Sequence, residues 1–183
     1  MSTSKNKPDW KRKLTKQEKI NCRQAAKEIQ KTENQKGLTT ETLARLLSGT
    51  RNFIGVYAED ELNTLIITSF PSFLICNIDS SSQPGSHWIA LGIFRHTIEI
   101  FDSSGFKIFL WSRVPCHLLN FIHKLSLTRQ VLVSNRLQSM KSTLCGFFSV
   151  FYVLARNCIT LSQINTLFTK RLAQNDLIIK NIF

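Results

Sequence analysis

Apolar residues form short continuous runs in the middle of the chain and recur at helical spacing nearer its two ends. The runs are rich in β-branched and aromatic residues and are bounded by polar turn residues, which is typical of buried strands. Four segments are therefore predicted to be strands: 73–78, 87–94, 97–102 and 130–134. Only Arg95 and His96 separate the second strand from the third, so these two strands are expected to form a hairpin.

Helical spacing and capping residues predict helices on both sides of this central region. The segment LTTETLARLLSG (38–49) places three leucines on one face, with Thr39 or Thr40 as the N-cap and Gly49 at the end. Residues 1–13 are expected to be irregular, and 14–34 are weakly helical because they lack a clean apolar stripe. Three further segments are predicted helices: 114–125 with Pro115 in its first turn, the uncharged run after Cys145, and 162–180.

This order of elements predicts an α+β fold with a central mixed β-sheet flanked by helices. A chain of 183 residues is long enough for one domain with a real core and an extension. Hydrophobic residues make up 43% of the chain and charged residues 20%, which is ordinary for a globular protein. We divide the chain into an N-terminal segment, 1–36, and a domain, 37–183.

The net charge of +12 is concentrated in the N-terminal segment. Residues 1–36 hold eleven Lys or Arg against four acidic residues, and the remaining 147 hold thirteen against eight. A basic arm of this kind suits the phosphate backbone of nucleic acid or an acidic protein surface. A solvated, partly disordered leader explains the same composition, and the sequence leaves both possibilities open.

Cysteine usage and the N-terminus indicate a reducing compartment inside the cell. The N-terminus is polar and lysine-rich, without the apolar region of a secretory signal, and no apolar stretch is long enough to span a bilayer. The cysteines are odd in number and show no CxxC spacing, which argues against a disulfide framework or a zinc site. They are Cys22, Cys76, Cys116, Cys145 and Cys158.

Cys145 stands before a glycine, at the start of the apolar run that extends to Ala155. A cysteine in such a place is either a small core residue or, at a helix N-terminus that lowers the thiol pKa, a nucleophile. His87 begins the first strand of the predicted hairpin and Asp102 ends the second, so both lie at its open end. A histidine oriented by an acid is the base half of a nucleophilic triad.

Gln138 precedes Cys145 by seven residues and could donate its amide N–H to an oxyanion. Taken singly, each residue also has an ordinary structural explanation, as a strand cap, a turn former or a core side chain. Their order, each at the end of an element, favours thiol chemistry. A metal site formed by Cys116, His117 and His123 is weaker, because the two histidines are six residues apart and do not share a helix face.

The segments GSHWIALGIF, IEIFDSSG and QSMKSTLCGFF together resemble the adenovirus-type (adenain-like) cysteine proteases, including those of Polinton/Maverick-type elements. These proteases are similar in turn to the SUMO-specific proteases. The shared pattern is His-Trp, an acid at the end of the next strand, a Gln and then Cys-Gly. The segment FIGVYAEDEL (53–62) resembles the substrate-side segment of the viral branch.

The resemblance implies a papain-like active site in which the chain order is His, Asp, Cys. It makes Cys145 the nucleophile, His87 the general base and Asp102 the residue that orients it. Gln138 and the Cys145 backbone N–H would form the oxyanion site. Substrate-binding positions would be Gly55, Tyr57 and Trp88.

The resemblance also implies a cysteine endopeptidase that processes viral or transposon-encoded structural precursors, often near small residues such as Gly. The enzyme would need no cofactor for its chemistry, with DNA as a possible activator, and would act in the host nucleus or the virion. We expect protein substrates, nucleic acid bound through the N-terminal segment, no membrane partner and a monomeric state. Two alternatives are an isopeptidase acting on ubiquitin-like (SUMO) tails and a non-enzymatic nucleic-acid-binding protein, the latter supported by charge alone.

Overall fold

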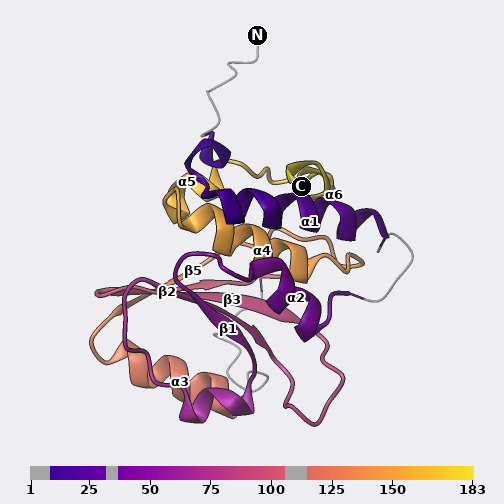
Figure 1. Ribbon diagram of the computed structural model, residues 1–183. Coiled ribbons are helices and arrows are strands. Elements are labelled where there is room, and N and C mark those ends of the chain that lie inside the picture. Colours follow the sequence, from indigo (N-terminus) through magenta and orange to yellow (C-terminus); the bar gives the residue numbers. More distant parts are fainter. Residues whose placement is uncertain (1–8, 32–36, 106–114) are drawn as a thin grey trace.

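The computed structural model describes residues 9–31, 37–105 and 115–183, and its centre is a five-stranded sheet in the order β1-β2-β3-β4-β5 (Figure 1). The outer pairs, β1–β2 and β4–β5, are parallel, whereas β2–β3 and β3–β4 are antiparallel. The predicted α+β fold with a mixed sheet is therefore confirmed. The strands are β1 (Phe53–Ala58), β2 (Ser72–Asn77), β3 (Trp88–Ile93), β4 (Thr97–Phe101) and β5 (Gln130–Val133).

Each face of the sheet buries its own hydrophobic cluster, because successive side chains of a strand point to opposite faces. In β3, Trp88 and Ala90 belong to the larger cluster, and Ile89 and Leu91 to the smaller one. The larger cluster lies under α1 (Lys16–Lys31), α2 (Thr40–Leu47), α4 (Cys145–Arg156) and α6 (Leu172–Ile182). Helix α3 (Cys116–Ser126) and the 3-10 helix η3 (Asp60–Thr64) cover the other face (Figure 1).

Helix α4 is the central helix of the domain, and every residue from Cys145 to Ala155 in it is buried. Its C-terminal end is fixed to β4 through the buried carboxylate of Glu99. This carboxylate accepts a hydrogen bond from Tyr152 Oη at 2.7 Å and two from the Arg156 guanidinium at 2.8 and 2.9 Å. A buried charge held by several partners has one favoured geometry, so these contacts fix α4 relative to the sheet.

The N-terminal segment is not a separate arm over its described residues. Helix α1 and the preceding η1 (Trp10–Lys13) pack onto the main core, to which Trp10, Ala25 and Ile29 contribute. The fully buried Glu18 carboxylate accepts hydrogen bonds from the Arg51 side chain at 3.0 and 3.1 Å. The sequence showed no clean apolar stripe because buried polar side chains of α1 also face the domain.

Most predicted elements are present, and two parts of the chain differ from the prediction. All four predicted strands and the 95–96 hairpin turn are confirmed, while β1 was not predicted as a strand. The segment 162–180 forms two helices, α5 (Leu161–Asn165) and α6, and not one. The chain breaks because the buried Asn175 side chain bonds the backbone N–H and C=O of Thr169 at 2.8 and 2.9 Å.

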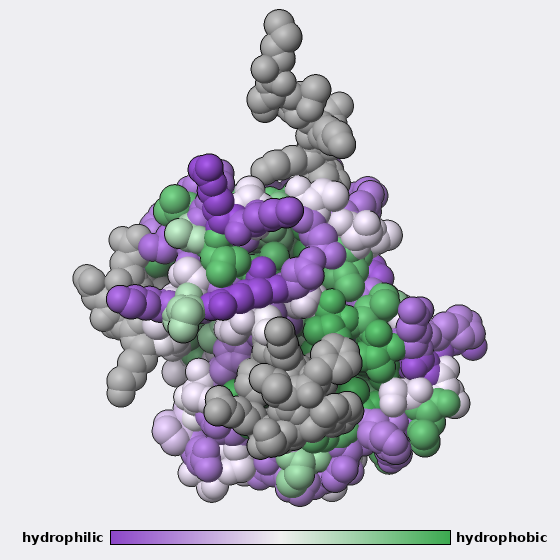
Figure 2. All heavy atoms as spheres, turned by 180° about the vertical axis from the view of Figure 1, so that it is seen from behind, coloured by the Kyte–Doolittle hydropathy of each residue, from purple (hydrophilic) through white to green (hydrophobic). Residues whose placement is uncertain are grey.

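The surface is mixed in character. Seen from behind, hydrophilic side chains lie across the upper part of the molecule and hydrophobic ones gather on one flank (Figure 2). Within the three described ranges, no helix has the length and apolar character needed to cross a membrane.

Candidate active site

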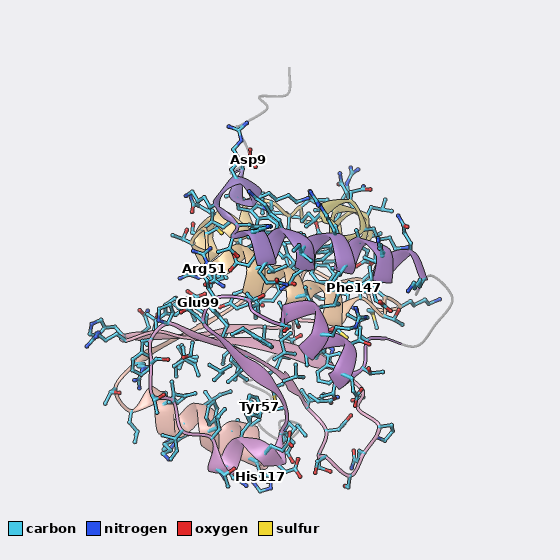
Figure 3. The ribbon with its side chains drawn as sticks, viewed as in Figure 1. Asp9, Arg51, Tyr57, Glu99, His117 and Phe147 are labelled. Carbon is cyan, nitrogen blue, oxygen red and sulfur yellow. The ribbon has the colours of Figure 1, made fainter. Side chains whose placement is uncertain are left out.

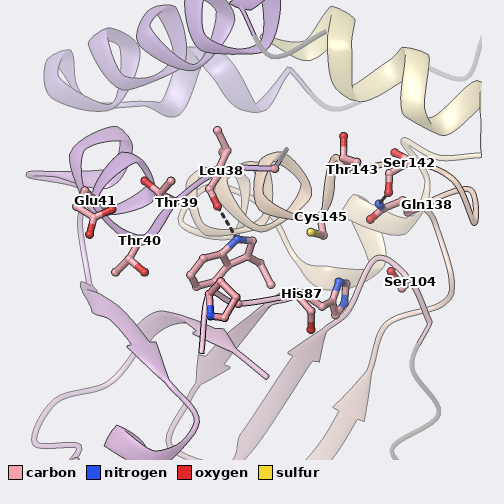
Figure 4. A pocket seen from close by; sticks show the side chains of 15 residues that line it. Leu38, Thr39, Thr40, Glu41, His87, Ser104, Gln138, Ser142, Thr143 and Cys145 are labelled. Atoms are coloured by element: carbon pink, nitrogen blue, oxygen red, sulfur yellow. Dashed lines mark hydrogen bonds between the residues drawn. The ribbon is translucent and has the colours of Figure 1, made fainter. Parts of the chain in front are cut away.

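The ends of three elements meet at one cleft of about 850 Å³ (Figure 4). His87 lies just before β3, Cys145 begins α4, and Gln138 lies on the loop between β5 and α4. Asp102 directly follows β4, whose register with β3 brings it to the same end of the hairpin as His87. The structure therefore brings these four predicted residues together. Residues 37–41 and 84–86 also line the cleft.

The His87 imidazole is held by the Asp102 carboxylate. Its Nε2 lies 2.7 Å from Asp102 Oδ1, and the carboxylate is only 1% exposed. Asp102 is itself fixed, since Oδ1 accepts the Ser104 N–H at 2.9 Å and the backbone N–H donates to Ser134 Oγ at 2.9 Å. Because Nε2 is occupied by the acid, Nδ1 is the ring nitrogen left for Cys145.

The environment of His87 favours its protonated form. Burial alone lowers its pKa, but hydrogen bonds to Asp102 and Cys145, together with their negative charge, outweigh burial and raise the pKa to about 10. An imidazolium between a carboxylate and a thiolate is the arrangement in which a cysteine is a ready nucleophile.

Cys145 is the first residue of α4 and is 8% exposed. The N–H groups of a helix's first turn have no intrahelical partner, and they favour negative charge on a nearby group. The next residue is a glycine for a steric reason, because a Cβ on Gly146 would lie only 3.1 Å from the Leu38 Cβ. The small residue thus lets the 37–41 wall of the cleft approach the helix beside the thiol.

The Gln138 side chain is buried and fixed at both ends of its amide. Its Oε1 accepts from Ser103 Oγ at 2.7 Å, and its Nε2 donates to the Ser142 carbonyl at 2.5 Å. The amide carries two N–H groups, and Ser142 takes one of them. Ser103 also accepts the Gln138 backbone N–H at 2.7 Å. Sequence analysis missed both serines, although Ser103 stands directly after Asp102 in the DSSG turn.

Trp88 forms part of the cleft wall beside His87, and its indole Nε1 donates to the Leu38 carbonyl at 2.8 Å (Figure 4). Gly55 and Tyr57, the other predicted substrate-binding residues, are not among the residues that line the cleft. Tyr57 packs with the smaller cluster, on the face of the sheet opposite α4, and both Tyr57 and His117 are labelled in the lower part of Figure 3. Its Oη donates to the Ile54 carbonyl at 2.9 Å.

The residues considered for a metal site make other contacts. His117 Nδ1 lies 2.6 Å from Asn63 Nδ2, and the His117 backbone N–H donates to Glu59 Oε2 at 3.2 Å. Among the residues that the structure describes, no group of three His, Cys, Asp or Glu side chains is placed to hold a metal ion.

A thiol at a helix N-terminus, an imidazole with an acid partner and a fixed amide donor are the groups that a cysteine peptidase uses. The chain is 32% identical over 91 residues to the cysteine protease S273R of African swine fever virus (isolate Tick/Malawi/Lil 20-1/1983). Over this part, the chain is therefore similar to a cysteine protease. The match covers 45% of this chain and about a third (32%) of the viral protein.

A search of solved structures finds the crystal structure of the selenomethionine ASFV pS273R protease, with a TM-score of 0.44 and 20% sequence identity. That alignment covers 80% of this chain and 66% of the other chain. No model of a protein family matches the sequence.

Proposed function

We propose that the chain is a cysteine endopeptidase in which Cys145 is the nucleophile, His87 transfers the proton, Asp102 orients His87, and Gln138 stabilises the oxyanion. The observation that supports this most strongly is the position of His87, between the buried carboxylate of Asp102 and the thiol at the start of α4. The partial identity to a viral cysteine protease points to the same class of reaction.

The reaction follows from these contacts. The Cys145 thiolate attacks the carbonyl carbon of the scissile amide, and the carbonyl oxygen gains the negative charge. The second Gln138 N–H and the Cys145 backbone N–H stabilise this oxygen. His87 Nδ1–H gives its proton to the leaving amine, which departs and leaves a thioester. His87 then takes a proton from water, whose oxygen attacks the thioester, and the collapse restores the thiolate and the imidazolium.

The substrates we propose are structural precursor proteins of a virus or transposon, as for an adenain-type enzyme. The resemblance of the HW, FDSSG and Gln-to-Cys-Gly segments to that branch supports the assignment, as does the viral origin of S273R. No cofactor is needed for the chemistry we describe. An isopeptidase acting on ubiquitin-like tails would use the same residues, so substrate assays must separate the two.

The experiment is hydrolysis of two substrate sets by the full chain, with Cys145→Ala as the matched inactive protein. One set is fluorogenic peptides with small residues at the cleaved bond, and the other is SUMO and ubiquitin conjugates. Cleavage of peptides and precursors without deconjugation supports the endopeptidase. Deconjugation as the main activity would replace it with the isopeptidase. Absence of any Cys145-dependent hydrolysis would remove both.

We also propose that the enzyme associates with DNA through the outer face of α1. Its basic residues repeat every three or four positions, so they form one exposed stripe about 22 Å long. The acidic residues of α1 lie elsewhere, since Glu18 is buried and Glu28 bonds Arg45 at 3.0 Å. The stripe consists of Lys16, Lys19, Arg23, Lys27 and Lys31.

Because α1 is part of the core, this proposal is tested by charge removal and not by deletion. Lys19→Gln, Arg23→Gln and Lys27→Gln together should weaken duplex binding at every sequence and reduce the slope of log K against log salt by about one per residue. Thermal unfolding checks that α1 remains packed. A control in which Arg95, Lys124 and Lys170, three exposed basic residues outside α1, are changed to Gln should retain most of the slope. Equal loss in both proteins would show that charge alone, and not α1, binds DNA.

A further inference from the structure

The C-terminal helix α6 contacts the loop that carries Gln138 on both sides of that residue. On one side, Asn175 Nδ2 donates to the Leu137 carbonyl at 3.0 Å. On the other side, Ser139 Oγ donates to Asp176 Oδ2 at 2.5 Å. Two adjacent residues of α6 therefore bond the two neighbours of the proposed oxyanion donor, although α6 contributes no residue to the lining of the cleft.

The contact that Asn175 makes is held in one orientation. Asn175 is fully buried, its Oδ1 accepts the Thr169 N–H at 2.8 Å, and its Nδ2 donates to the carbonyls of both Thr169 and Leu137. The two N–H groups and the oxygen of the amide are all used, so any rotation of this side chain would leave a buried polar group unpaired.

Helix α6 is itself anchored in the core and to the N-terminal segment. Ile179 is fully buried in the main cluster, and the ring of Phe183, just after the helix, packs against Phe147 of α4. Lys11 Nζ donates to the Ile182 carbonyl near the end of α6. The contacts to Leu137 and Ser139 thus connect the loop to a fixed element.

An oxyanion donor acts only when it is held close to its productive position, and supporting contacts supply that precision. Ser103 and Ser142 hold the Gln138 side chain, but its main chain lies on a loop. We propose that Asn175 and Asp176 are positioning residues that fix the loop backbone around Gln138, so that α6 sets the oxyanion site from outside the cleft. This inference rests on the proposed function, because it assigns α6 a role in the same reaction.

The experiment removes the Asp176 contact in two backgrounds, wild type and Gln138→Ala. In the wild-type background, Asp176→Ala should lower kcat about tenfold, within the range that small misplacements cause, with little change in KM. Asp176→Asn should retain most of kcat, since its amide oxygen can still accept the Ser139 hydroxyl. The rate of Cys145 alkylation should not change, because that reaction forms no oxyanion. Leu177→Ala, on the exposed side of α6, is the matched control.

In the Gln138→Ala background, Asp176→Ala should have no further effect on kcat, because the group that it positions is gone. An equal loss of kcat in both backgrounds would show a general structural role and overturn the proposal, as would an unchanged kcat for Asp176→Ala alone. Hydrogen exchange of backbone amides 139–144 gives a measurement independent of activity. Exchange should become faster in Asp176→Ala and stay unchanged in Leu177→Ala, and failure of this result would reject the positioning role even if the chain cleaved no peptide.

Discussion

Replacement of Gln138 by Ala tests whether the buried amide contributes to catalysis. The mutation removes the proposed side-chain donor to the oxyanion and leaves the Cys145 backbone N–H in place. Loss of one such donor lowers kcat roughly 10²–10³-fold in a well-studied protease, or about 2.7–4 kcal/mol of transition-state stabilisation. KM should change little if chemistry limits turnover, since the contact forms only as charge develops on the oxygen.

The same mutation also removes partners from the Ser103 hydroxyl and the Ser142 carbonyl. The buried Ser103 hydroxyl, left unpaired, costs about 1–3 kcal/mol of folding stability, and the half-buried Ser142 carbonyl costs less, so thermal unfolding must accompany the kinetics. Gln138→Glu keeps the volume and an acceptor for Ser103 but donates nothing, and its charge would repel the oxyanion. It should therefore be at least as harmful to kcat.

The assay is steady-state hydrolysis of a fluorogenic peptide, with the rate of Cys145 alkylation measured on the same proteins. Alkylation should be nearly unchanged in Gln138→Ala, because the nucleophile and His87 remain. The exposed Gln130→Ala on β5 serves as a control for loss of a glutamine. A folded Gln138→Ala protein with the kcat of the wild type would refute the oxyanion assignment.

Further predictions concern the remaining residues of the site. Among the five cysteines, Cys145 should react fastest with iodoacetamide near neutral pH, as read by peptide mass spectrometry, and faster labelling of the exposed Cys116 would contradict its assignment. His87→Ala should lose most of kcat, and Asp102→Asn should lose less. Because the pKa of His87 is raised to about 10, the wild-type pH profile of kcat/KM should fall only as the pH rises through that value, and the fall should move to lower pH in Asp102→Asn. The free energy of unfolding should likewise decrease between about pH 6.5 and 10, where the folded state holds a proton that the unfolded state releases, as urea titrations can measure. Ser103→Ala should lower kcat less than Gln138→Ala does, while Ser103→Thr, which keeps the hydroxyl, should stay near wild type; equal kcat in both Ser103 variants would exclude a role for that hydroxyl.

Three of the four central residues, His87, Asp102 and Cys145, could be predicted because each lies at the end of an element whose neighbours follow from local pattern. The hairpin turn at 95–96 fixes the register that brings His87 near Asp102, and the uncharged run identifies the buried helix that begins at Cys145. Gln138 was indicated by its spacing from Cys145. None of these inferences required contacts between distant elements.

Most of the features that sequence analysis missed depend on tertiary packing. Ser103 bonds Gln138 across 35 residues of chain, and no local pattern indicates that contact. The break before α6 comes from Asn175, whose burial shows only when the helix is packed. Tyr57 lies on the far face of the sheet because β1 pairs with β2, a strand about 20 residues later, with an irregularity between Phe53 and Gly55.

For the proposed association with DNA, the packing of α1 would also set the orientation of the cleft. A free 36-residue arm would act as a flexible tether, with a typical end-to-end reach of about 30–36 Å and random orientation of the cleft. Helix α1 instead shares one core with α4, and the Glu18–Arg51 ion pair joins it to the loop before β1. An enzyme bound through α1 would therefore hold its cleft in one fixed orientation relative to the DNA, and it would cleave only those protein segments that can enter the cleft in that orientation.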